Sequence, residues 1–360
     1  MNITIVGGGN IGTQFAVHCA EQGNRVKIYT TRPKEFSKVL CILDENDNII
    51  HRGKIHLATD DAMIAFKDAD LVFVTVPAYL MSNMASKILP YVKCGMKICL
   101  VPGTGGGECA FKQCIEKGCI LFGLQRVPSV ARLVEYGKRV RCVGYREELF
   151  VGAIPNKFVS ECATIISNLF SKKCTVLPNY LSLTLTPSNP ILHTTRLRTL
   201  FQDYKKGKYY KKVPLFYEEW SDESSALLFD CDDEVQSLCK LLTDFDLTYV
   251  KSLKYHYESQ TIQELTNKIR SIKGFKGLET PCVNNENGYL PDFSSRYFTA
   301  DFPFGLSIIK QIMDFVGMEA PNCKETLSWY YSVADMSIDE FRYSDFGIDS
   351  YDKFIEFYSI

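Results

Sequence analysis

A glycine-rich run near the amino terminus, Gly7-Gly8-Gly9-Asn10-Ile11-Gly12, could bind the phosphates of a dinucleotide. It follows directly on a short apolar segment, residues 3–6, which is expected to form a buried strand. Gly7 would permit the tight turn that follows such a strand, and Gly9 would let the backbone approach a pyrophosphate without an intervening side chain. Gly12 would allow a helix to pack closely against the strand.

These glycines predict a dinucleotide site only in the right structural context, because in an isolated loop they would predict only a structural turn. A helix is expected over residues 13–21 and a second strand over residues 25–30. The result is a strand–turn–helix–strand unit, the setting in which this glycine pattern predicts a dinucleotide site. The free N–H groups at the helix start, near Asn10 and Ile11, would receive the phosphates.

The end of the second strand bears on the choice of cofactor. Sites for NAD commonly place Asp or Glu there to bind the ribose hydroxyls, whereas an Arg accommodates the 2′-phosphate of NADP. The sequence Tyr29-Thr30-Thr31-Arg32-Pro33-Lys34 contains no acid. We therefore expect Thr31 and Arg32 to contact the cofactor, with NADP(H) favoured and NAD(H) as the alternative. A solvated basic loop is the purely structural explanation.

His193 is the histidine best placed for proton transfer among the five in the chain. Ser188-Asn189-Pro190 combines a capping residue with an early proline and predicts a helix start just before it. The helix dipole there disfavours the imidazolium, which favours proton exchange near neutral pH. A structural histidine is the alternative. His18 is expected within the first helix, and His51 and His56 in a polar, hairpin-like region.

A second candidate segment, residues 294–305, combines Arg296 with Asp301 in a region that is otherwise aromatic. An Arg can hold a substrate carboxylate through two parallel hydrogen bonds. An acid can orient and support a catalytic imidazole. The structural alternative is an Arg–Asp ion pair that fixes a loop.

These residues need elements that position them, and the first half of the chain predicts alternating strands and helices. Apolar runs at residues 71–76, 97–101 and 120–124 are expected to be parallel strands. Ligands bind at the carboxyl edge of such a sheet, where Gln125 follows the third run. The remaining elements expected in a dinucleotide-binding domain over residues 1–182 are strands at 140–145 and 174–178 and a helix at 157–170.

Residues 183–360 are predicted to form an all-helical domain. Helices are expected at about 224–242, 261–272, 305–316 and 326–333, and Gly317 is typical of a helix stop. The predicted fold is thus α/β plus all-α, a Rossmann-type parallel sheet domain followed by a helical domain. The substrate is expected between the two.

Charge and composition exclude several function classes. The 360 residues include 41 Lys and Arg against 42 Asp and Glu, a net charge of −1, which argues against binding nucleic acid or a polybasic membrane anchor. The 14 cysteines include no Cys-x-x-Cys pair, so we expect reduced thiols and no metal. Neither a leader pattern nor a run of about 18 apolar residues occurs, which predicts a cytoplasmic chain.

Over nearly its full length the chain resembles the octopine/nopaline (opine) dehydrogenases. The resemblance rests on the glycine run and on Asn189-Pro190-Ile191-Leu192-His193, Glu223-Ser224-Ser225, and Arg296-Tyr297 with Asp301-Phe302-Pro303-Phe304-Gly305-Leu306. It implies NAD(P)H-dependent condensation of a 2-oxo acid with the amine of an amino acid through an imine.

The resemblance also implies roles for individual residues. It places the catalytic His and Asp at His193 and Asp301, and substrate-binding residues at Arg296 and Gln125. Imine reduction needs a hydride donor, a proton shuttle and recognition of carboxylates, which the glycine turn, His193 and Arg296 could supply.

Other interpretations stay open at this point. One is an oxidoreductase of the same architecture that reduces a 2-oxo acid without an amine, and another is a non-catalytic dinucleotide-sensing protein. The segment Glu218-Glu219-Trp220 is a weaker candidate for shaping the amine pocket. The sequence also leaves a homodimer open.

Overall fold

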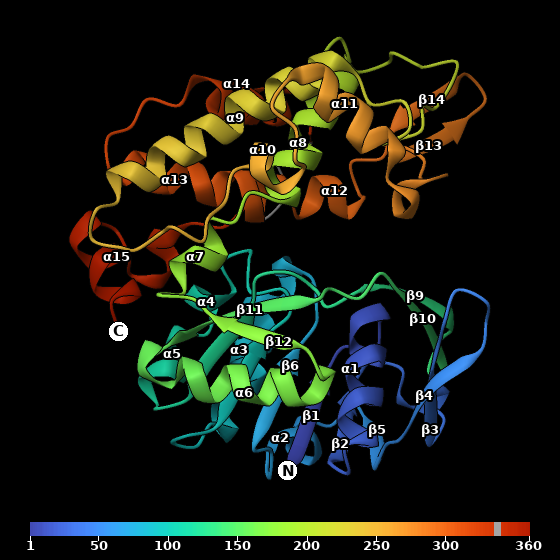
Figure 1. The fold of residues 1–360 in the computed structure, drawn as a ribbon, viewed down its shortest axis with the longest axis vertical. Coiled ribbons are helices and arrows are strands. Elements are labelled where there is room, and N and C mark those ends of the chain that lie inside the picture. The colour runs from blue at the N-terminus through green and yellow to red at the C-terminus, as the bar shows by residue number, and fades with distance from the viewer. Residues whose placement is uncertain (335–339) are drawn as a thin grey trace. The chain divides into compact units, whose positions relative to one another are not determined.

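A computed structural model describes residues 1–334 and 340–360. The chain divides into two compact units, one of residues 1–184 with 356–360 and the other of residues 185–355 (Figure 1). The sequence predicted a second domain that continues to the carboxyl end, whereas residues 356–360 belong to the first unit. The first unit is therefore made from two pieces of chain.

An eight-stranded sheet forms the centre of the first unit, in the order β12-β11-β8-β7-β6-β1-β2-β5. Its neighbours run parallel except for the antiparallel pair β8 and β11, which confirms the predicted parallel α/β domain. The strands are β1 (Asn2–Val6), β2 (Arg25–Tyr29), β5 (Leu57–Thr59), β6 (Leu71–Val74), β7 (Lys97–Leu100), β8 (Ile120–Leu124), β11 (Glu148–Ile154) and β12 (Lys173–Val176). The sequence did not predict β11.

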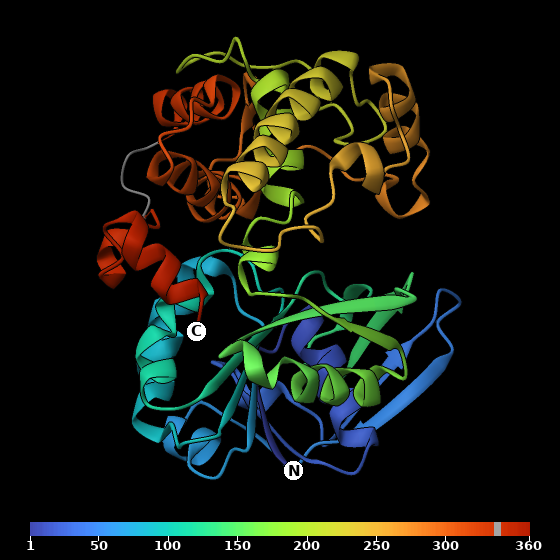
Figure 2. The ribbon, with the colours of Figure 1, turned by 60° about the vertical axis from the view of Figure 1, so that its left-hand side comes forward.

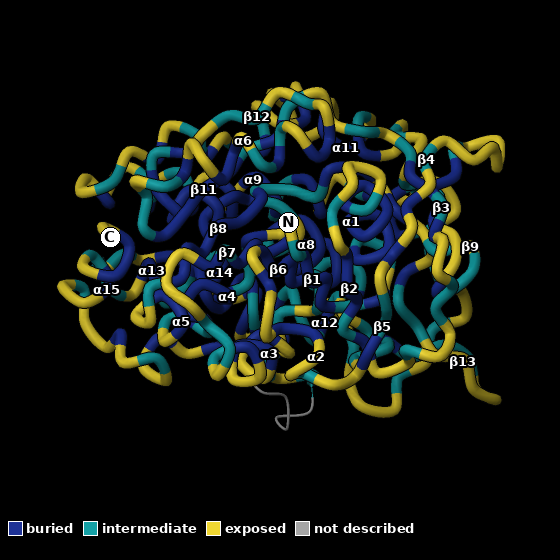
Figure 3. The backbone as a smooth tube through the Cα atoms, turned by 90° about the horizontal axis from the view of Figure 1, so that it is seen from below, coloured by how far each residue is buried: buried dark blue, intermediate teal, exposed yellow. Residues whose placement is uncertain are grey.

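Helices cover both faces of this sheet, so its central strands are buried on both sides and their sequences are continuously apolar (Figure 3). Helices α1 and α6 lie on one face, and Phe15 of α1 packs against Phe73 of β6 and Phe170 of α6. The helices of the unit are α1 (Asn10–Glu21), α2 (Ala62–Phe66), α3 (Met81–Ile88), α4 (Gly107–Ala110), α5 (Lys112–Glu116), α6 (Val159–Phe170) and α7 (Leu181–Thr184).

A separate four-stranded sheet, in the order β4-β3-β10-β9, also belongs to the first unit. Its strands are β3 (Val39–Leu43), β4 (Ile49–Lys54), β9 (Val130–Glu135) and β10 (Arg139–Val143). The strand predicted at 140–145 thus lies outside the main sheet. In β10 buried residues alternate with more exposed ones, which is typical of a strand in a sheet that has one face in solvent. Strands of a sheet covered on both faces are instead continuously apolar.

The second unit is built mainly of helices, as predicted (Figure 2). The yellow helix α9 lies beside α8, and the Ser221 hydroxyl accepts a hydrogen bond from the N–H of Ser224 at its start. The helices are α8 (Asn189–Leu200), α9 (Asp222–Leu241), α10 (Leu253–His256), α11 (Ile262–Ser271), α12 (Arg296–Thr299), α13 (Ser307–Phe315) and α14 (Pro321–Val333), while α15 (Tyr351–Tyr358) ends in the first unit.

The prediction that this part is all-helical is wrong in one place. Strands β13 (Cys282–Asn285) and β14 (Gly288–Pro291) form an antiparallel hairpin within it. These strands were not predicted because both are short, β13 is largely exposed and β14 is mostly half-buried, so neither carries a buried apolar run.

Two further properties concern the chain as a whole. All fourteen cysteines lie in the described ranges, and all are free. Among residues 1–334 and 340–360, no helix combines the length and apolar character needed to cross a membrane.

Candidate active site

The glycine turn of the first unit has the backbone geometry that its sequence demands. Gly7 has φ of +105°, a conformation that other residues rarely adopt. A Cβ at Gly12 would lie only 1.9 Å from the carbonyl oxygen of Gly7, so this position requires glycine. Around Gly9, by contrast, nothing lies within 4 Å of an added Cβ, which leaves the backbone open to a ligand.

Helix α1 begins at Asn10, three residues earlier than predicted. The side-chain oxygen of Asn10 accepts a hydrogen bond of 2.8 Å from the N–H of Leu133 in β9, which ties the helix start to the smaller sheet. Ile11 packs against the core of the unit. The free N–H groups of this first turn remain available to an anion.

Arg32 lies just past the end of β2 and is half exposed. Its guanidinium carbon is 3.6 Å from the ring centre of Tyr136, and Nη1 is 3.5 Å from a carboxylate oxygen of Glu35. The Tyr136 hydroxyl is in turn 3.0 Å from that of Thr30, whereas Thr31 is exposed. Because an exposed ion pair stabilises little, Arg32 can exchange Glu35 for another anion at small cost.

Gln125 follows β8 at the carboxyl edge of the main sheet, the same edge at which β1 leads into the glycine turn. Its backbone N–H donates to the carbonyl oxygen of Phe150 in β11, and the residue is half buried. It therefore belongs to the first unit, together with every residue predicted to bind the cofactor.

In the second unit the fold brings His193 and Asp301 together, although 108 residues separate them. Nδ1 of His193 lies 2.8 Å from a carboxylate oxygen of Asp301. The His193 side chain is 6% exposed and that of Asp301 16%, so the pair is largely shielded from water. An ionised carboxylate only accepts hydrogen bonds, so the proton of the neutral imidazole belongs on Nδ1.

The other ring nitrogen, Nε2, lies 2.8 Å from the hydroxyl of Tyr217. With Nδ1 protonated, Nε2 accepts a hydrogen bond from the Tyr217 O–H. Burial raises the pKa of Tyr217 far above its usual range, so the phenol stays protonated and able to donate. The sequence analysis did not predict this contact, because its candidates in this segment were Glu218, Glu219 and Trp220, which follow Tyr217.

Close packing of Gly305 against Pro190 holds Asp301 and His193 in this arrangement. A Cβ at Gly305 would lie 2.9 Å from Cβ and Cγ of Pro190, so glycine is required where the π-helical turn Phe302–Leu306 meets the first turn of α8. Asp301 immediately precedes that turn. Helix α8 begins at Asn189 as predicted, although the Ser188 side chain makes no capping hydrogen bond with it.

Aromatic rings enclose the imidazole of His193. The ring centre of Tyr297 is 4.4 Å away and that of Phe216 is 5.6 Å away, the latter edge-on. Tyr217 stacks on Phe275 with ring centres 4.0 Å apart. This apolar enclosure strengthens the electrostatic interaction between the imidazole and its carboxylate.

Arg196, one helical turn after His193, fixes the segment that carries Tyr217. Its buried guanidinium donates to the carbonyl oxygens of Phe216 (3.0 Å) and Glu219 (2.6 Å) and to the Ser224 hydroxyl (3.1 Å). Burial lowers the pKa of Arg196 to about 10, which still leaves it charged at neutral pH. Both flanks of Tyr217 are thereby anchored to α8.

Among the described residues, Arg296, Glu219 and Trp220 form no hydrogen bond or ion pair with His193 or Asp301. Arg296 opens α12 and is exposed, and within the described ranges it has no ion-pair partner. The expected structural alternative, an Arg296–Asp301 ion pair, is therefore absent from that part of the chain. Trp220 is fully buried and donates to the Ser225 hydroxyl, while Glu219 binds Lys212 and the N–H of Leu215.

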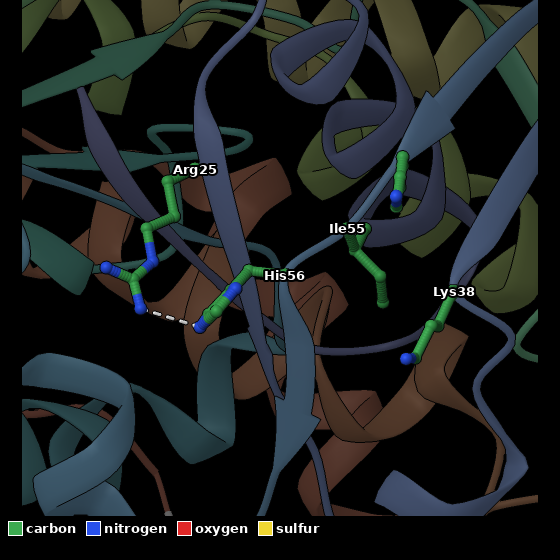
Figure 4. A pocket seen from close by; sticks show the side chains of 5 residues that line it. Arg25, Lys38, Ile55 and His56 are labelled. Atoms are coloured by element: carbon green, nitrogen blue, oxygen red, sulfur yellow. Dashed lines mark hydrogen bonds between the residues drawn. The ribbon is translucent and has the colours of Figure 1, made fainter.

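A pocket of about 440 Å³ on the first unit contains none of the predicted residues (Figure 4). Its lining is mostly cationic and consists of Arg25, Lys38, Lys54, Ile55 and His56. Arg25 opens β2, so this pocket lies at the amino edge of the sheet, opposite the glycine turn. Arg25 also contacts Nε2 of His56 at 2.6 Å.

Comparison with known proteins gives consistent results for both units. Residues 176–334 match the family model of the NAD/NADP octopine/nopaline dehydrogenase alpha-helical domain, and residues 2–104 match the N-terminus of NAD-dependent glycerol-3-phosphate dehydrogenase. Tauropine dehydrogenase of Arabella iricolor is 26% identical over 91% of this chain and 90% of its own length. Octopine dehydrogenase of Mizuhopecten yessoensis is 24% identical over 91% and 89%.

A solved structure of octopine dehydrogenase with NADH and L-arginine shares the fold with a TM-score of 0.85, at 21% identity and with 99% of this chain and 98% of the other covered. The predicted resemblance to the octopine/nopaline dehydrogenase family is therefore confirmed, and the relatives that share it are NAD(P)-dependent oxidoreductases.

Proposed function

We propose that the chain catalyses the NAD(P)H-dependent reductive condensation of a 2-oxo acid with the amine of an amino acid. The observation that carries this proposal is the buried chain of Asp301, His193 and Tyr217, joined by two contacts of 2.8 Å. A buried imidazole with a defined tautomer is suited to moving one proton between substrate atoms. The relatives named opine, octopine and tauropine dehydrogenases support the reaction class.

The first unit fits a nicotinamide dinucleotide. The open space around Gly9 and the positive φ of Gly7 leave a cradle that a side chain would fill, directly before the start of α1. Bound there in its reduced form, the cofactor supplies the hydride. Gln125 lies at the same edge of the sheet and would contact a substrate.

Proton movement falls to the second unit. The lone pair on Nε2 of His193 takes a proton from the incoming ammonium through the Tyr217 hydroxyl, which gives its own proton to Nε2 as it receives another. Asp301 stabilises the resulting imidazolium. The free amine adds to the carbonyl carbon, and one of its N–H protons moves to the carbonyl oxygen. The proton on Nε2 then passes to the resulting hydroxyl, which leaves as water and gives an iminium. The iminium accepts a hydride at carbon to give the secondary amine. Exposed Arg296 is free to hold a substrate carboxylate.

We further propose that NADPH is preferred over NADH. No acid follows β2, and Arg32 and Thr31 are both exposed there. Arg32 already stacks on Tyr136 and faces a carboxylate at Glu35, which is the kind of anionic partner that a 2′-phosphate would replace. A yersinopine dehydrogenase structure with a TM-score of 0.63 holds NADP+, so the fold is compatible with this cofactor.

The decisive experiment offers the full chain pairs of 2-oxo acids and amino acids and follows NADPH and NADH absorbance. The expected result is oxidation that needs both members of a pair, with a secondary-amine dicarboxylate as the product by mass spectrometry. Oxidation by an oxo acid alone, unaffected by any amine, would instead assign a 2-oxo acid reductase. Consumption of neither cofactor by any pair would contradict an enzymatic function and favour a dinucleotide sensor.

A further inference from the structure

Three potential metal ligands lie close together near the carboxyl end of α1, the end of this helix that is away from the glycine turn. They are His18 and Glu21 of α1 and His51 of β4, and one ligand atom from each lies within 4.8 Å of the other two. His18 is buried, whereas the side chains of His51 and Glu21 are about one-third exposed, at 35% and 38%. The cluster is thus anchored on its inner side and open to solvent on its outer side.

Local structure aims all three side chains at one point. His18 and Glu21 are three residues apart, so they share one face of α1. Strand β4 approaches this face very closely, because a Cβ at Gly53 would lie 2.6 Å from the carbonyl oxygen of Val17. A β-bulge beside His51 leaves Ile50 unpaired, and bulges commonly redirect a neighbouring side chain.

The existing contacts already order the ligand atoms. Nδ1 of His51 is 2.7 Å from a carboxylate oxygen of Glu21, and the two imidazole rings of His18 and His51 have centres 4.8 Å apart. His18 is held from behind by Phe170 and by the Tyr145 hydroxyl, 3.2 Å from Nε2.

We propose that His18, Glu21 and His51 bind a divalent transition-metal ion of the zinc class. Two imidazoles and one carboxylate, with a fourth position open to water, form a ligand set that zinc uses in proteins. Imidazole ligands disfavour Mg²⁺ and Ca²⁺, which prefer oxygen. Ligand atoms of a tetrahedral zinc site are roughly 3.3 Å apart, so small rotations of the partly exposed Glu21 and His51 side chains would bring the three ligand atoms to that spacing.

The ion would replace the proton that Glu21 and His51 now share and would crosslink α1 to β4. Helix α1 has 12 residues from Asn10 to Glu21 and therefore covers about 16 Å from the first to the last, which separates the site from the glycine turn and from any direct part in hydride transfer. A ligand that binds only the folded state raises its stability. We therefore assign the ion a stabilising role in the first unit.

The test measures binding of Zn²⁺ by calorimetry and of Co²⁺ by visible absorption, using the full chain after treatment with a chelator. The expected result is one ion per chain, a Co²⁺ spectrum typical of a four-coordinate site without thiolate charge transfer, and a higher melting temperature with Zn²⁺. Glu21→Gln and His51→Ala should each weaken binding at least tenfold. Paramagnetic Co²⁺ should also shift the imidazole NMR signals of His18 and His51.

His56→Ala is the matched control, because it removes a histidine from the same region of the first unit without touching the cluster. His56 contacts Arg25 (Figure 4) and lines a pocket together with Lys38 and Lys54, so the positive charge there opposes a cation. Binding should therefore be unchanged in this variant. Equal affinity in His51→Ala and the parent chain, or thiolate bands in the Co²⁺ spectrum, would overturn the proposal and leave Glu21 and His51 as an ordinary ion pair. Circular dichroism verifies that each variant folds.

Discussion

The hydroxyl of Tyr217 lies 2.8 Å from Nε2 of His193, on the side of the imidazole opposite to Asp301. The nitrogen proposed to carry a proton is thus occupied by a neutral phenol before any substrate arrives. This contact orients the ring and excludes water from Nε2, and it makes Tyr217 a residue with a measurable effect on the reaction.

We expect Tyr217→Phe to lower kcat/KM roughly fivefold to tenfold, because one hydrogen bond worth about 1 kcal/mol is lost while the ring and its packing remain. Steady-state kinetics with the active substrate pair would measure the effect. Tyr255→Phe, on an exposed side chain of the same unit, should leave both constants unchanged. If Tyr217→Phe behaves like that control, Tyr217 acts only in packing.

His193→Gln should reduce the rate by roughly 10²-fold to 10⁴-fold, the usual contribution of a general acid–base group. Asp301→Asn should also cause a large loss, because an amide can no longer hold the proton on Nδ1. Binding of NADPH, followed by its fluorescence, should not change, since the predicted cofactor residues lie in the first unit. His256→Gln serves as the control, and full activity of His193→Gln would contradict the assigned role.

Gly305→Ala should destabilise the second unit by about 1–3 kcal/mol, the usual effect of forcing a methyl group into a packed site. The new Cβ would press on Pro190 at 2.9 Å and displace the turn that follows Asp301, so kcat should fall as well. Urea unfolding and kinetics measure the two effects. Gly274→Ala, where nothing lies within 4 Å, is expected to be near neutral.

Arg32→Ala tests the choice of cofactor. Removal of a charge-assisted contact worth about 1.5–3 kcal/mol should weaken NADPH binding by tenfold or more and leave NADH binding nearly unchanged. Glu35→Gln should not weaken NADPH binding, because it removes only the carboxylate that competes for Arg32. An unchanged NADPH affinity in Arg32→Ala would show that the 2′-phosphate assignment is wrong.

Asp232 should make stability depend on pH. Burial raises the pKa of this carboxyl from 3.8 to about 7, although it accepts a hydrogen bond of 2.7 Å from the N–H of Leu253. The folded state therefore binds the proton more tightly than the unfolded one. The associated stabilisation is complete below about pH 4 and is lost as the pH rises through 7.

Asp232→Asn removes this dependence while keeping the shape of the side chain. Urea unfolding at pH 5 and pH 8 should show a smaller loss of stability in the variant, with a difference of up to a few kcal/mol. Asp230→Asn, on an exposed neighbour, should follow the parent chain. Identical pH profiles for the parent chain and Asp232→Asn would refute the assigned burial effect.

The sequence predicted the features that depend on local pattern. Apolar runs such as Leu71–Val74 indicated buried parallel strands because both faces of the sheet are covered. The glycine turn was recognisable because Gly7 and Gly12 meet steric demands that other residues cannot. His193 and Asp301 were paired through a family resemblance, since nothing in the sequence itself places residues 108 positions apart in contact.

Other features depend on tertiary contacts that carry no local signal. Tyr217 contacts His193 because Arg196 anchors the irregular segment on either side of Tyr217. The spacing of apolar residues in the sequence does not indicate such an anchor. His18 and His51 were assigned to a helix and a hairpin, and only the close approach of β4 at Gly53 brings them together. Of the smaller sheet only the strand at 140–145 was predicted as a strand, because β4 and β9 each bury a single residue and carry no buried apolar run.

The return of the chain to the first unit bears on how the molecule is made. Tyr358 donates a hydrogen bond of 2.6 Å to the buried carboxylate of Glu108, which also accepts one from Thr184. The ribosome adds Tyr358 only after it has synthesised the 171 residues from Leu185 to Ile355, which are the entire second unit. During translation Glu108 therefore lacks the hydrogen bond from Tyr358 until the second unit has been synthesised. The cofactor-binding unit is begun first, but its last residues are added after those of the second unit.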